Sequence, residues 1–509
     1  MNQNYDVIII GGGATGLGVA IESVSRGYKT ILFEQEDFGK STSSKSTKLV
    51  HGGIRYLANL DFKLVKEGLE ERYFFINNSR HLSKVQPYLI PFYSYKNKIK
   101  FTIGTFLYDL LASRYNIGKS KSINANDVIK LAPFLKTKNL IGGLIYYDGQ
   151  FDDSRMLISM LRTFENLDGV AHNYHQVIAI NKNNNNVVTG VTILDKINNK
   201  IYEVKSKVVI NATGVFTDDL INMSEDKLEN NNLVVSQGSH ILCKNDNLKS
   251  EYAVVIPETK DDRILFILPW HDCALIGTTD VKVSKPVLDP IASKLEVKFI
   301  MDSVKKFSKH EIKQEDIKSS FAGLRPLVKK NSNTNSSTLS RAHKIIFSSN
   351  KLISVVGGKW TIYRRMGEDT INFAIQQGML PKSNSITKYL KLFGWTEESI
   401  EYPLSVYGKD YYKILDIQKE LNNYELLHKD LPYYYAEVIY QIKYEMVKTV
   451  EDVLSRRTRA VILNPIAAVE VAPIVANLIA KYYNYDDNWI SDQLNKFNSF
   501  AKNYIVKLD

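Results

Sequence analysis

Cysteine is nearly absent from this chain of 509 residues, which has only Cys243 and Cys273. Two cysteines cannot form the multiple disulfides that staple small secreted domains. They also cannot supply the thiolates of an iron–sulfur centre, and no other group of residues suggests a metal site. The composition therefore favours a protein of a reducing compartment that binds no metal.

Targeting and membrane-spanning segments are also missing from the sequence. The chain starts with Asn2, Gln3 and Asn4 directly before a predicted strand, without the basic and apolar regions of a signal peptide. The most apolar stretch, residues 460–480, contains Glu470, and a carboxylate near the centre of a spanning helix costs about 2.5–3.5 kcal/mol. We therefore expect a core helix that begins near Pro465, and a protein that is not embedded in a membrane.

The remaining composition is that of an ordinary globular protein. Hydrophobic residues make up 44% of the chain and charged residues 24%, which excludes a disordered or fibrous protein. The length suits two or three domains. The net charge of +11 suits nucleic acid, an anionic membrane surface or an anionic substrate, and charge alone does not choose among them.

A glycine-rich turn near the start of the chain predicts a dinucleotide site. Residues 5–10 (YDVIII) are typical of a parallel strand buried on both faces. The GxGxxG pattern follows at Gly11, Gly13 and Gly16. Such a turn lets a pyrophosphate approach the N-terminus of the next helix. Glu34 ends the following strand 21 residues after Gly13, which suits a carboxylate on a ribose and disfavours NADP.

Two later glycine turns favour FAD over NAD, because FAD is long enough to need contacts from distant parts of the chain. Residues 208–214 (VVINATG) and 354–361 (SVVGGKWT) each combine a buried strand with a turn of small residues. Between these motifs, residues 61–80 predict a helix with charges on one face, including Glu71 and Arg72. Strand-like alternation over residues 236–279 predicts a second sheet.

Further motifs give the chain a resemblance to a known family. Residues 41–57 (STSSKSTKLVHGGIRYL) resemble the hallmark of the FAD-dependent glycerol-3-phosphate dehydrogenases. The match continues in order through residues 238–240 (GSH), 269–270 (PW), 277–280 (GTTD), 323–327 (GLRPL), 357–364 (GGKWTIYR) and 445–454 (EMVKTVEDVL). One departure is Gln237, where the family usually has a basic residue.

The resemblance implies an α/β fold with three parts. These are a glutathione-reductase-like FAD-binding domain, an antiparallel-sheet substrate domain and a helical C-terminal cap domain. We expect the first two domains to be interleaved in residues 1–395, with the substrate sheet at roughly 80–160 and 236–345. The cap is expected in residues 396–509.

The resemblance also implies the reaction and its partners. The family oxidises sn-glycerol 3-phosphate to dihydroxyacetone phosphate by hydride transfer to FAD and passes the electrons to a membrane quinone. A homodimer on the cytoplasmic face of the bacterial inner membrane is the implied setting. A glycerol-3-phosphate oxidase that uses O2 is the first alternative. A flavin-dependent RNA-modifying or RNA-binding protein is the second, although no RNA-recognition signature is found and we expect no nucleic acid partner.

The candidate site residues follow from the chemistry of a phosphorylated alcohol. Such a substrate needs cations for its phosphate and a proton acceptor for its hydroxyl. The cations are Arg55, Arg325, Arg341 and Lys359, and Tyr56 either bonds the substrate or packs on the flavin. His51 is the preferred base, with His240 as its competitor or as a group that polarises the carbonyl, and Arg325 and Lys359 complete the catalytic set. The predicted FAD-binding residues are Gly11, Gly13, Gly16, Glu34, Thr42, Ser43, Ser46, Thr47, Leu49, Val177, Ala212, Thr213, Gly214, Gly357, Gly358, Lys359, Trp360 and Thr361.

Residues 88–115 mix aromatic side chains with Lys96, Lys98 and Lys100. This composition is typical of a segment that lies on an anionic lipid surface. An ordinary lid or domain surface would have a similar composition, and the sequence leaves both interpretations open.

Overall fold

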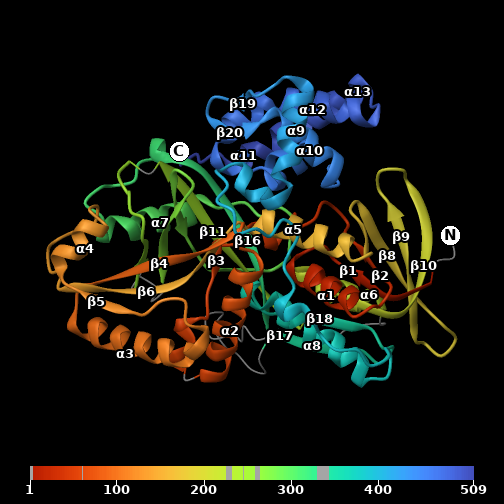
Figure 1. The fold of residues 1–509 in the computed structure, drawn as a ribbon, viewed down its shortest axis with the longest axis horizontal. Helices are drawn as coiled ribbons and strands as arrows, with labels where there is room; N and C mark the ends of the chain where they lie inside the picture. The colour runs from red at the N-terminus through yellow and green to blue at the C-terminus, as the bar shows by residue number, and fades with distance from the viewer. Residues whose placement is uncertain are drawn as a thin grey trace.

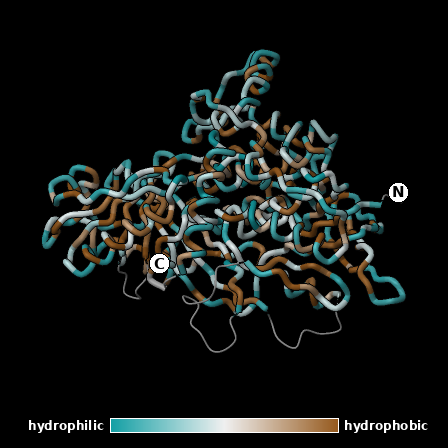
Figure 2. The backbone as a smooth tube through the Cα atoms, turned by 60° about the horizontal axis from the view of Figure 1, so that its bottom comes forward, coloured by the Kyte–Doolittle hydropathy of each residue, from teal (hydrophilic) through white to brown (hydrophobic). Residues whose placement is uncertain are grey.

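Two large sheets and a helical cap make up the fold of the computed structural model (Figure 1). The structure describes residues 4–59, 61–224, 232–244, 246–257, 264–329 and 343–508. The chain passes several times between the two sheets before it enters the cap. Apolar segments lie mostly in the interior and hydrophilic segments along the margins (Figure 2).

The first sheet contains the predicted dinucleotide motif. Its main path runs β17-β18-β10-β1-β2-β7, and β1 pairs in parallel with both β2 and β10. The strands are β1 (Asn4–Ile10), β2 (Thr30–Phe33), β7 (Val170–His172), β8 (His175–Lys182), β9 (Val188–Asp195), β10 (Lys200–Asn211), β17 (His343–Phe347) and β18 (Ile353–Gly357). Strand β1 reads as one apolar run because both of its faces are covered.

Helices cover one face of this sheet and strands cover the other. On the helical face, Val7 and Ile9 pack with residues of α1, α5 and α8. On the opposite face, Ile8 and Ile10 pack against the antiparallel β8-β9-β10 layer. The helices around the sheet are α1 (Ala14–Ser25), α5 (Asp153–Asn166), α6 (Thr217–Ser224) and α8 (Tyr363–Gln376).

The second sheet is largely antiparallel and runs β15-β11-β14-β13-β12-β4-β6-β3, with β16 on β11 and β5 on β6. Its strands are β3 (Leu49–Val50), β4 (Ser83–Phe92), β5 (Lys121–Ile123), β6 (Gly142–Phe151), β11 (Leu233–Lys244), β12 (Ala253–Ile256), β13 (Leu265–Trp270), β14 (Cys273–Gly277), β15 (Val281–Val283) and β16 (Ile317–Val328). Its helices are α2 (Phe62–Asn78), α3 (Tyr95–Ala112), α4 (Ala125–Leu131) and α7 (Lys294–Phe307). Cys243 and Cys273 are free thiols that belong to different apolar clusters of this sheet.

The cap lies over both sheets, at the top of Figure 1, and continues the core of the second sheet. It consists of α9 (Tyr411–Leu421), the hairpin β19 (Leu426–His428) and β20 (Leu431–Tyr434), α10 (Tyr435–Tyr444), a π-helical turn at Asp452–Arg457, α11 (Ala460–Leu463), α12 (Pro465–Tyr483) and α13 (Asp487–Ala501). Helix α12 is long and apolar enough to cross a membrane by length and composition alone. Its Val471, Val475 and Ile479 are buried in the protein core, as expected of a core helix.

The predicted α/β fold with a helical C-terminal domain is confirmed. One local prediction was wrong, because the charges of α2 do not all lie on one face: Lys63 and Lys66 are exposed, whereas Glu71 and Arg72 point into the protein. Glu71 is buried and pairs with Arg364, and Arg72 is buried and pairs with Asp148. Each of these charges turns inward because an opposite charge from a distant part of the chain lies there.

Candidate functional site

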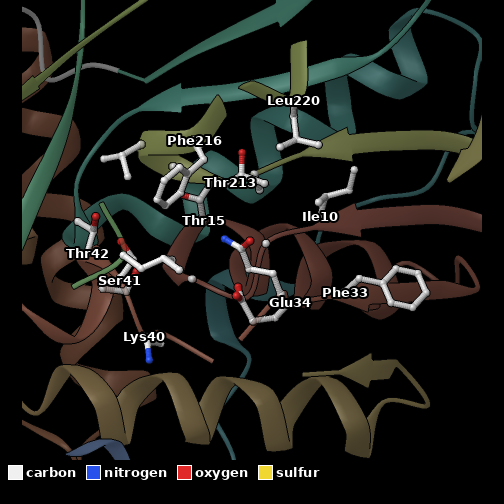
Figure 3. Close-up of a pocket in the computed structure, with 18 of the residues that line it drawn as sticks. Ile10, Thr15, Phe33, Glu34, Lys40, Ser41, Thr42, Thr213, Phe216 and Leu220 are labelled. Atoms are coloured by element: carbon white, nitrogen blue, oxygen red, sulfur yellow. The ribbon is translucent and has the colours of Figure 1, made fainter. Parts of the chain in front are cut away.

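A cavity of about 340 Å³ lies at the carboxyl ends of β1, β2 and β10, against the N-terminus of α1. Figure 3 shows Phe216 and Leu220 along one side of the cavity and Phe33 and Glu34 along the other. Nine of the predicted FAD-binding residues line it: Gly11, Gly13, Glu34, Thr42, Ser43, Val177, Ala212, Thr213 and Gly214. The carboxyl end of a parallel sheet is where open α/β folds bind ligands.

The turn between β1 and α1 requires glycine at two positions. Gly11 has a φ of +108°, and a Cβ there would lie 2.7 Å from the carbonyl oxygen of Ala212. Gly16 does not line the cavity, but a Cβ on it would lie 1.8 Å from the carbonyl oxygen of Gly11. The two glycines therefore let the strand, the turn and the helix pack close together, so that the helix N-terminus faces the cavity.

Glu34 is fixed by the backbone at the edge of the cavity. Its carboxylate accepts hydrogen bonds from the N–H groups of Gly12, at 2.7 Å, and Glu36, at 3.0 Å. Burial raises the pKa of Glu34 above its ordinary value. A carboxylate held in this way can accept further hydrogen bonds from ribose hydroxyls.

The loop after β2 supplies hydroxyl groups that need a partner. The buried side-chain oxygens of Ser41 and Thr42 have no hydrogen-bond partner among the described residues, and both residues line the cavity. Buried polar groups normally have partners, so these hydroxyls fit a ligand with polar groups of its own. Ser43 is held in place because its hydroxyl accepts from the N–H of Ala14 and its carbonyl accepts from the indole of Trp360.

Sequence reasoning missed part of the cavity lining. Lys40, His175, Gln176, Phe216, Asp219, Leu220 and Leu288 also line it. These residues belong to no motif, and of the β8 residues only Val177 was named. The composition of a strand gives no signal for which of its residues will face a ligand.

Several predicted residues gather beside the cavity rather than in its lining. They form two groups, one at each end of strand β3. At one end of it the hydroxyl of Thr47 lies 2.9 Å from Nε2 of His240, and at the other the N–H of His51 donates to the hydroxyl of Thr361 at 3.1 Å. Thr47 and His51 are four residues apart, so their Cα atoms lie within about 14 Å of each other.

Lys359 lies at the His51 end of β3. Its ammonium group lies 3.4 Å from the carbonyl oxygen of His51 and 3.5 Å from that of Gly52. The same group lies over the ring of Tyr56, 5.1 Å from the centroid. Gly357, Gly358 and Trp360 surround Lys359 in sequence at the end of β18.

His240 and Arg325 lie at the other end of β3. Arg325 donates to the hydroxyl of Thr278 at 2.7 Å and to the carbonyl of Thr279 at 3.1 Å. Its side chain is 24% exposed, and the next residue, Pro326, lines the cavity. His240 is buried and stacks on Phe321.

The environment of His240 keeps this residue neutral. Burial, with smaller contributions from Arg325 and Lys48, holds the pKa of His240 well below its ordinary value. Its Nδ1 atom has no partner among the described residues. Of the other predicted residues, Ser46 donates to Asp153 and Leu49 is in β3. Arg341 and the side chain of Arg55 lie outside the described residues.

Family models match most of the chain. A model described as "FAD dependent oxidoreductase" matches residues 6–362, and a model described as "C-terminal domain of alpha-glycerophosphate oxidase" matches residues 351–489. The fold and the cavity thus define an FAD-dependent oxidoreductase, and the predicted cofactor, FAD, is confirmed.

Individual relatives narrow the family further. A Dictyostelium discoideum protein named as a probable mitochondrial glycerol-3-phosphate dehydrogenase is 36% identical over 99% of this chain and 85% of its own length. The human mitochondrial glycerol-3-phosphate dehydrogenase is 33% identical over 98% of this chain and 73% of its own length. The chain belongs to the FAD-dependent glycerol-3-phosphate dehydrogenase family, as its motifs predicted.

Solved structures agree with this assignment. The glycerol-3-phosphate dehydrogenase of Bacillus halodurans complexed with FAD has a TM-score of 0.81 and 25% identity, with 99% of this chain and 96% of that chain covered. The L-alpha-glycerophosphate oxidase of Mycoplasma pneumoniae with FAD bound has a TM-score of 0.57 and 18% identity, with 73% and 94% covered. The second likeness concerns the fold alone.

Proposed function

We propose that the protein oxidises sn-glycerol 3-phosphate to dihydroxyacetone phosphate and passes the electrons to a membrane quinone. The observation that carries the proposal is that a cation lies near a histidine at each end of β3: Lys359 lies 3.4 Å from the backbone carbonyl of His51, and Arg325 is close enough to His240 to lower its pKa. An anionic alcohol needs both kinds of group. The names of the relatives support glycerol 3-phosphate as that alcohol.

Arg325 and Lys359 are the phosphate ligands in this proposal. The guanidinium of Arg325 is already oriented by Thr278 and Thr279, so little side-chain freedom is lost when an anion binds. Lys359 contributes a point charge beside the carbonyl groups of His51 and Gly52. Bound FAD supplies the acceptor for the hydride of the substrate. The residues of the chain orient the alcohol and remove its proton.

His51 is the proposed base. A base works best when its pKa lies near the working pH. Burial holds the pKa of His240 well below its ordinary value, so His240 is a weak acceptor and suits the role of a neutral group that polarises the carbonyl. This assignment keeps both histidines at the site but gives them different tasks.

Helix α3 supports a peripheral position on an anionic membrane. It buries Asn97, Thr105, Tyr108 and Ala112 and packs Phe101, Leu107 and Leu111 against the core, yet it also exposes a row of apolar residues. The apolar row is Tyr95, Ile99, Ile103, Phe106 and Leu110, each between 56% and 69% exposed. Lys96 and Lys100 are exposed beside this row.

A helix that exposes an apolar row beside lysines fits an interface in which apolar side chains enter the lipid and lysines contact anionic headgroups. A large exposed apolar surface of this kind marks an interaction site. A quinone acceptor dissolved in the membrane would be within reach of a protein held there. The cytoplasmic face of the bacterial inner membrane, and a homodimer, stay predictions.

Anaerobic reduction of the yellow protein tests the function. Glycerol 3-phosphate should bleach the flavin absorbance, and glycerol should not. A quinone analogue should then restore the colour faster than O2 does. Rapid reoxidation by O2 with release of H2O2 would favour the oxidase, and bleaching by glycerol would contradict the phosphate site.

The same reduction assay applied to Arg325→Ala tests the proposed role of Arg325 in binding the phosphate. Loss of one charge-assisted contact is worth roughly 1.5–3 kcal/mol, so KM for glycerol 3-phosphate should rise about tenfold or more. Flavin content should not change. Arg365→Ala, which removes an arginine from the solvent-facing side of α8, is the matched control and should leave KM unchanged.

A further inference from the structure

The loop of residues 37–48, between β2 and β3, has two kinds of contact. Its residues Gly39, Lys40, Ser41, Thr42 and Ser43 line the FAD cavity. Its other charged side chains, Asp37, Lys45 and Lys48, are buried in the protein. Loops normally run over the surface, where water solvates their charges. A buried charge needs an opposite charge or hydrogen bonds from the protein in place of water, so these three side chains need such partners.

The compensation for Asp37 comes from the cap. Its carboxylate lies 2.5 Å from Nε of Arg456 and accepts two bonds from Arg457, at 2.5 and 2.9 Å. The side chains of Asp37 and Arg457 are fully buried. Burial alone would raise the pKa of Asp37, but the two guanidinium groups outweigh this effect and hold the pKa below its ordinary value.

Further contacts between the loop and the cap follow along the loop. Lys40 pairs with Glu451 of the cap at 3.0 Å, and Glu451 also pairs with Arg456 at 2.7 Å. The ammonium group of Lys45 donates to the hydroxyl of Tyr504. The cap therefore contacts the loop on both sides of the residues that line the cavity.

The far end of the loop reaches the cap through Asp153 at the start of α5. Ser46 and Lys48 of the loop both donate to this carboxylate, at 2.7 and 2.6 Å. Arg459 of the cap donates to it at 3.0 Å. The buried charge of Asp153 is thus shared between the loop and the cap.

We propose that the cap is part of the FAD-binding machinery. Arg456 and Arg457 act as positioning residues that hold the 37–48 loop, through Asp37, in the conformation that binds the cofactor. Without these arginines Asp37 would be buried and unpaired, and the loop would have to move toward solvent. Because coupling between two equilibria is reciprocal, bound FAD must equally stabilise the docking of the cap.

A second buried ion pair between the cap and the FAD-binding part provides a matched control. Glu445 pairs with Arg155 of α5 at 2.7 and 2.8 Å, and both side chains are buried. This pair touches no residue of the loop. The backbone carbonyl of Glu445 also accepts from the guanidinium of Arg457, and Arg155 donates to the carbonyl of Arg457. Glu445→Gln leaves both carbonyls unchanged, so it weakens a buried ion pair between the cap and the FAD-binding part and keeps every side chain that binds Asp37.

The test is the release of FAD from the full-length holoenzyme, followed as free flavin fluorescence after dilution. Asp37→Asn should release FAD at least about tenfold faster than the wild type, and Glu445→Gln within about twofold of it. Excess FAD should raise the Tm of Glu445→Gln as much as it raises the Tm of the wild type. It should raise the Tm of Asp37→Asn much less. A purely structural role would predict equal effects in the two variants.

A milder variant protects the test against misfolding. Glu451→Gln weakens the ion pairs that Glu451 of the cap forms with Lys40 and Arg456. The side chain of Glu451 is partly exposed, which makes this substitution milder than Asp37→Asn. It should speed FAD release several-fold. Wild-type release from both Asp37→Asn and Glu451→Gln, or equal acceleration in Glu445→Gln, would overturn the proposal.

Discussion

At the scale of single residues, the sequence predicts what a local turn requires but not which residues pair across long distances along the chain. The sequence could predict Gly11, Gly16 and Glu34, because a tight strand–helix turn imposes fixed demands within a few residues. Asp37 gave no such signal, because Arg456 and Arg457 are 419 and 420 residues away along the chain. Only the fold brings such pairs together.

The division of labour between the two histidines is a prediction at the same scale. His51→Gln should leave FAD bound and slow flavin reduction by roughly 10²–10⁴-fold, the usual contribution of a general base. His240→Gln should slow it less. It should also leave the pH profile between pH 6 and 8 unchanged, since burial holds the pKa of His240 well below its ordinary value.

Stopped-flow reduction by glycerol 3-phosphate across that pH range measures both effects. His310→Gln, which changes an exposed histidine, is the control. Unimpaired reduction in His51→Gln together with a strong defect in His240→Gln would exchange the two roles.

At the scale of elements, the hydrophobic pattern predicted β1, α2 and the strands of residues 236–279, whereas the 80–160 part of the second sheet followed only from the family resemblance. The pattern did not predict what covers these elements. The 88–115 segment was identified as unusual by its aromatic residues and lysines. The sequence could not show that α3 would turn Thr105 and Tyr108 inward and Ile103 and Phe106 outward. A rule that places apolar residues inside could not choose between the faces of this helix, because Phe101, Leu107 and Leu111 pack against the core while the exposed row is apolar as well. On the inner side Tyr108 donates to the buried Asp148.

Two sets of changes in α3 should separate the forces that hold it on a membrane. Lys96, Lys98 and Lys100 changed together to Glu should abolish retention on anionic liposomes at low salt, because each basic residue contributes about 1 kcal/mol near such a surface. Ile99, Ile103 and Phe106 changed together to Ser should remove the retention that persists at high salt. Flavin reduction by substrate should be normal in both variants.

Ile466 and Ile474 changed to Ser on α12 are the matched control, because these side chains are also exposed and apolar. Liposome flotation at low and high salt is the measurement. Equal retention on neutral and anionic liposomes, or none on either, would contradict the electrostatic part of the proposal.

At the scale of the whole molecule, histidines that are buried or partly buried make acid stability a property of the fold. His81, His172, His240 and His271 come from different parts of the chain, yet burial lowers the pKa of each, to about 3 for His81 and about 4 for His172 and His271. An unfolded histidine has a pKa of about 6.5. Above that pH the histidines are neutral in both states. As the pH falls below it, the unfolded state binds protons that the folded state does not, so stability is lost.

Each histidine should cost up to about 1.4 kcal/mol of the free energy of unfolding per pH unit between pH 6.5 and its own folded pKa. Buried carboxyls with raised pKa, such as Glu437 at about 7, act in the opposite direction and offset part of this loss. The contribution of single histidines is therefore best seen as a difference in slope. His81→Asn and His271→Asn should each flatten the fall of Tm between pH 6.5 and 4.5, even if their Tm at pH 7.5 is lower than that of the wild type. His310→Asn should follow the wild-type curve, because this side chain is exposed. If all four proteins lose Tm in parallel as the pH falls, the acid sensitivity does not come from these partly buried histidines.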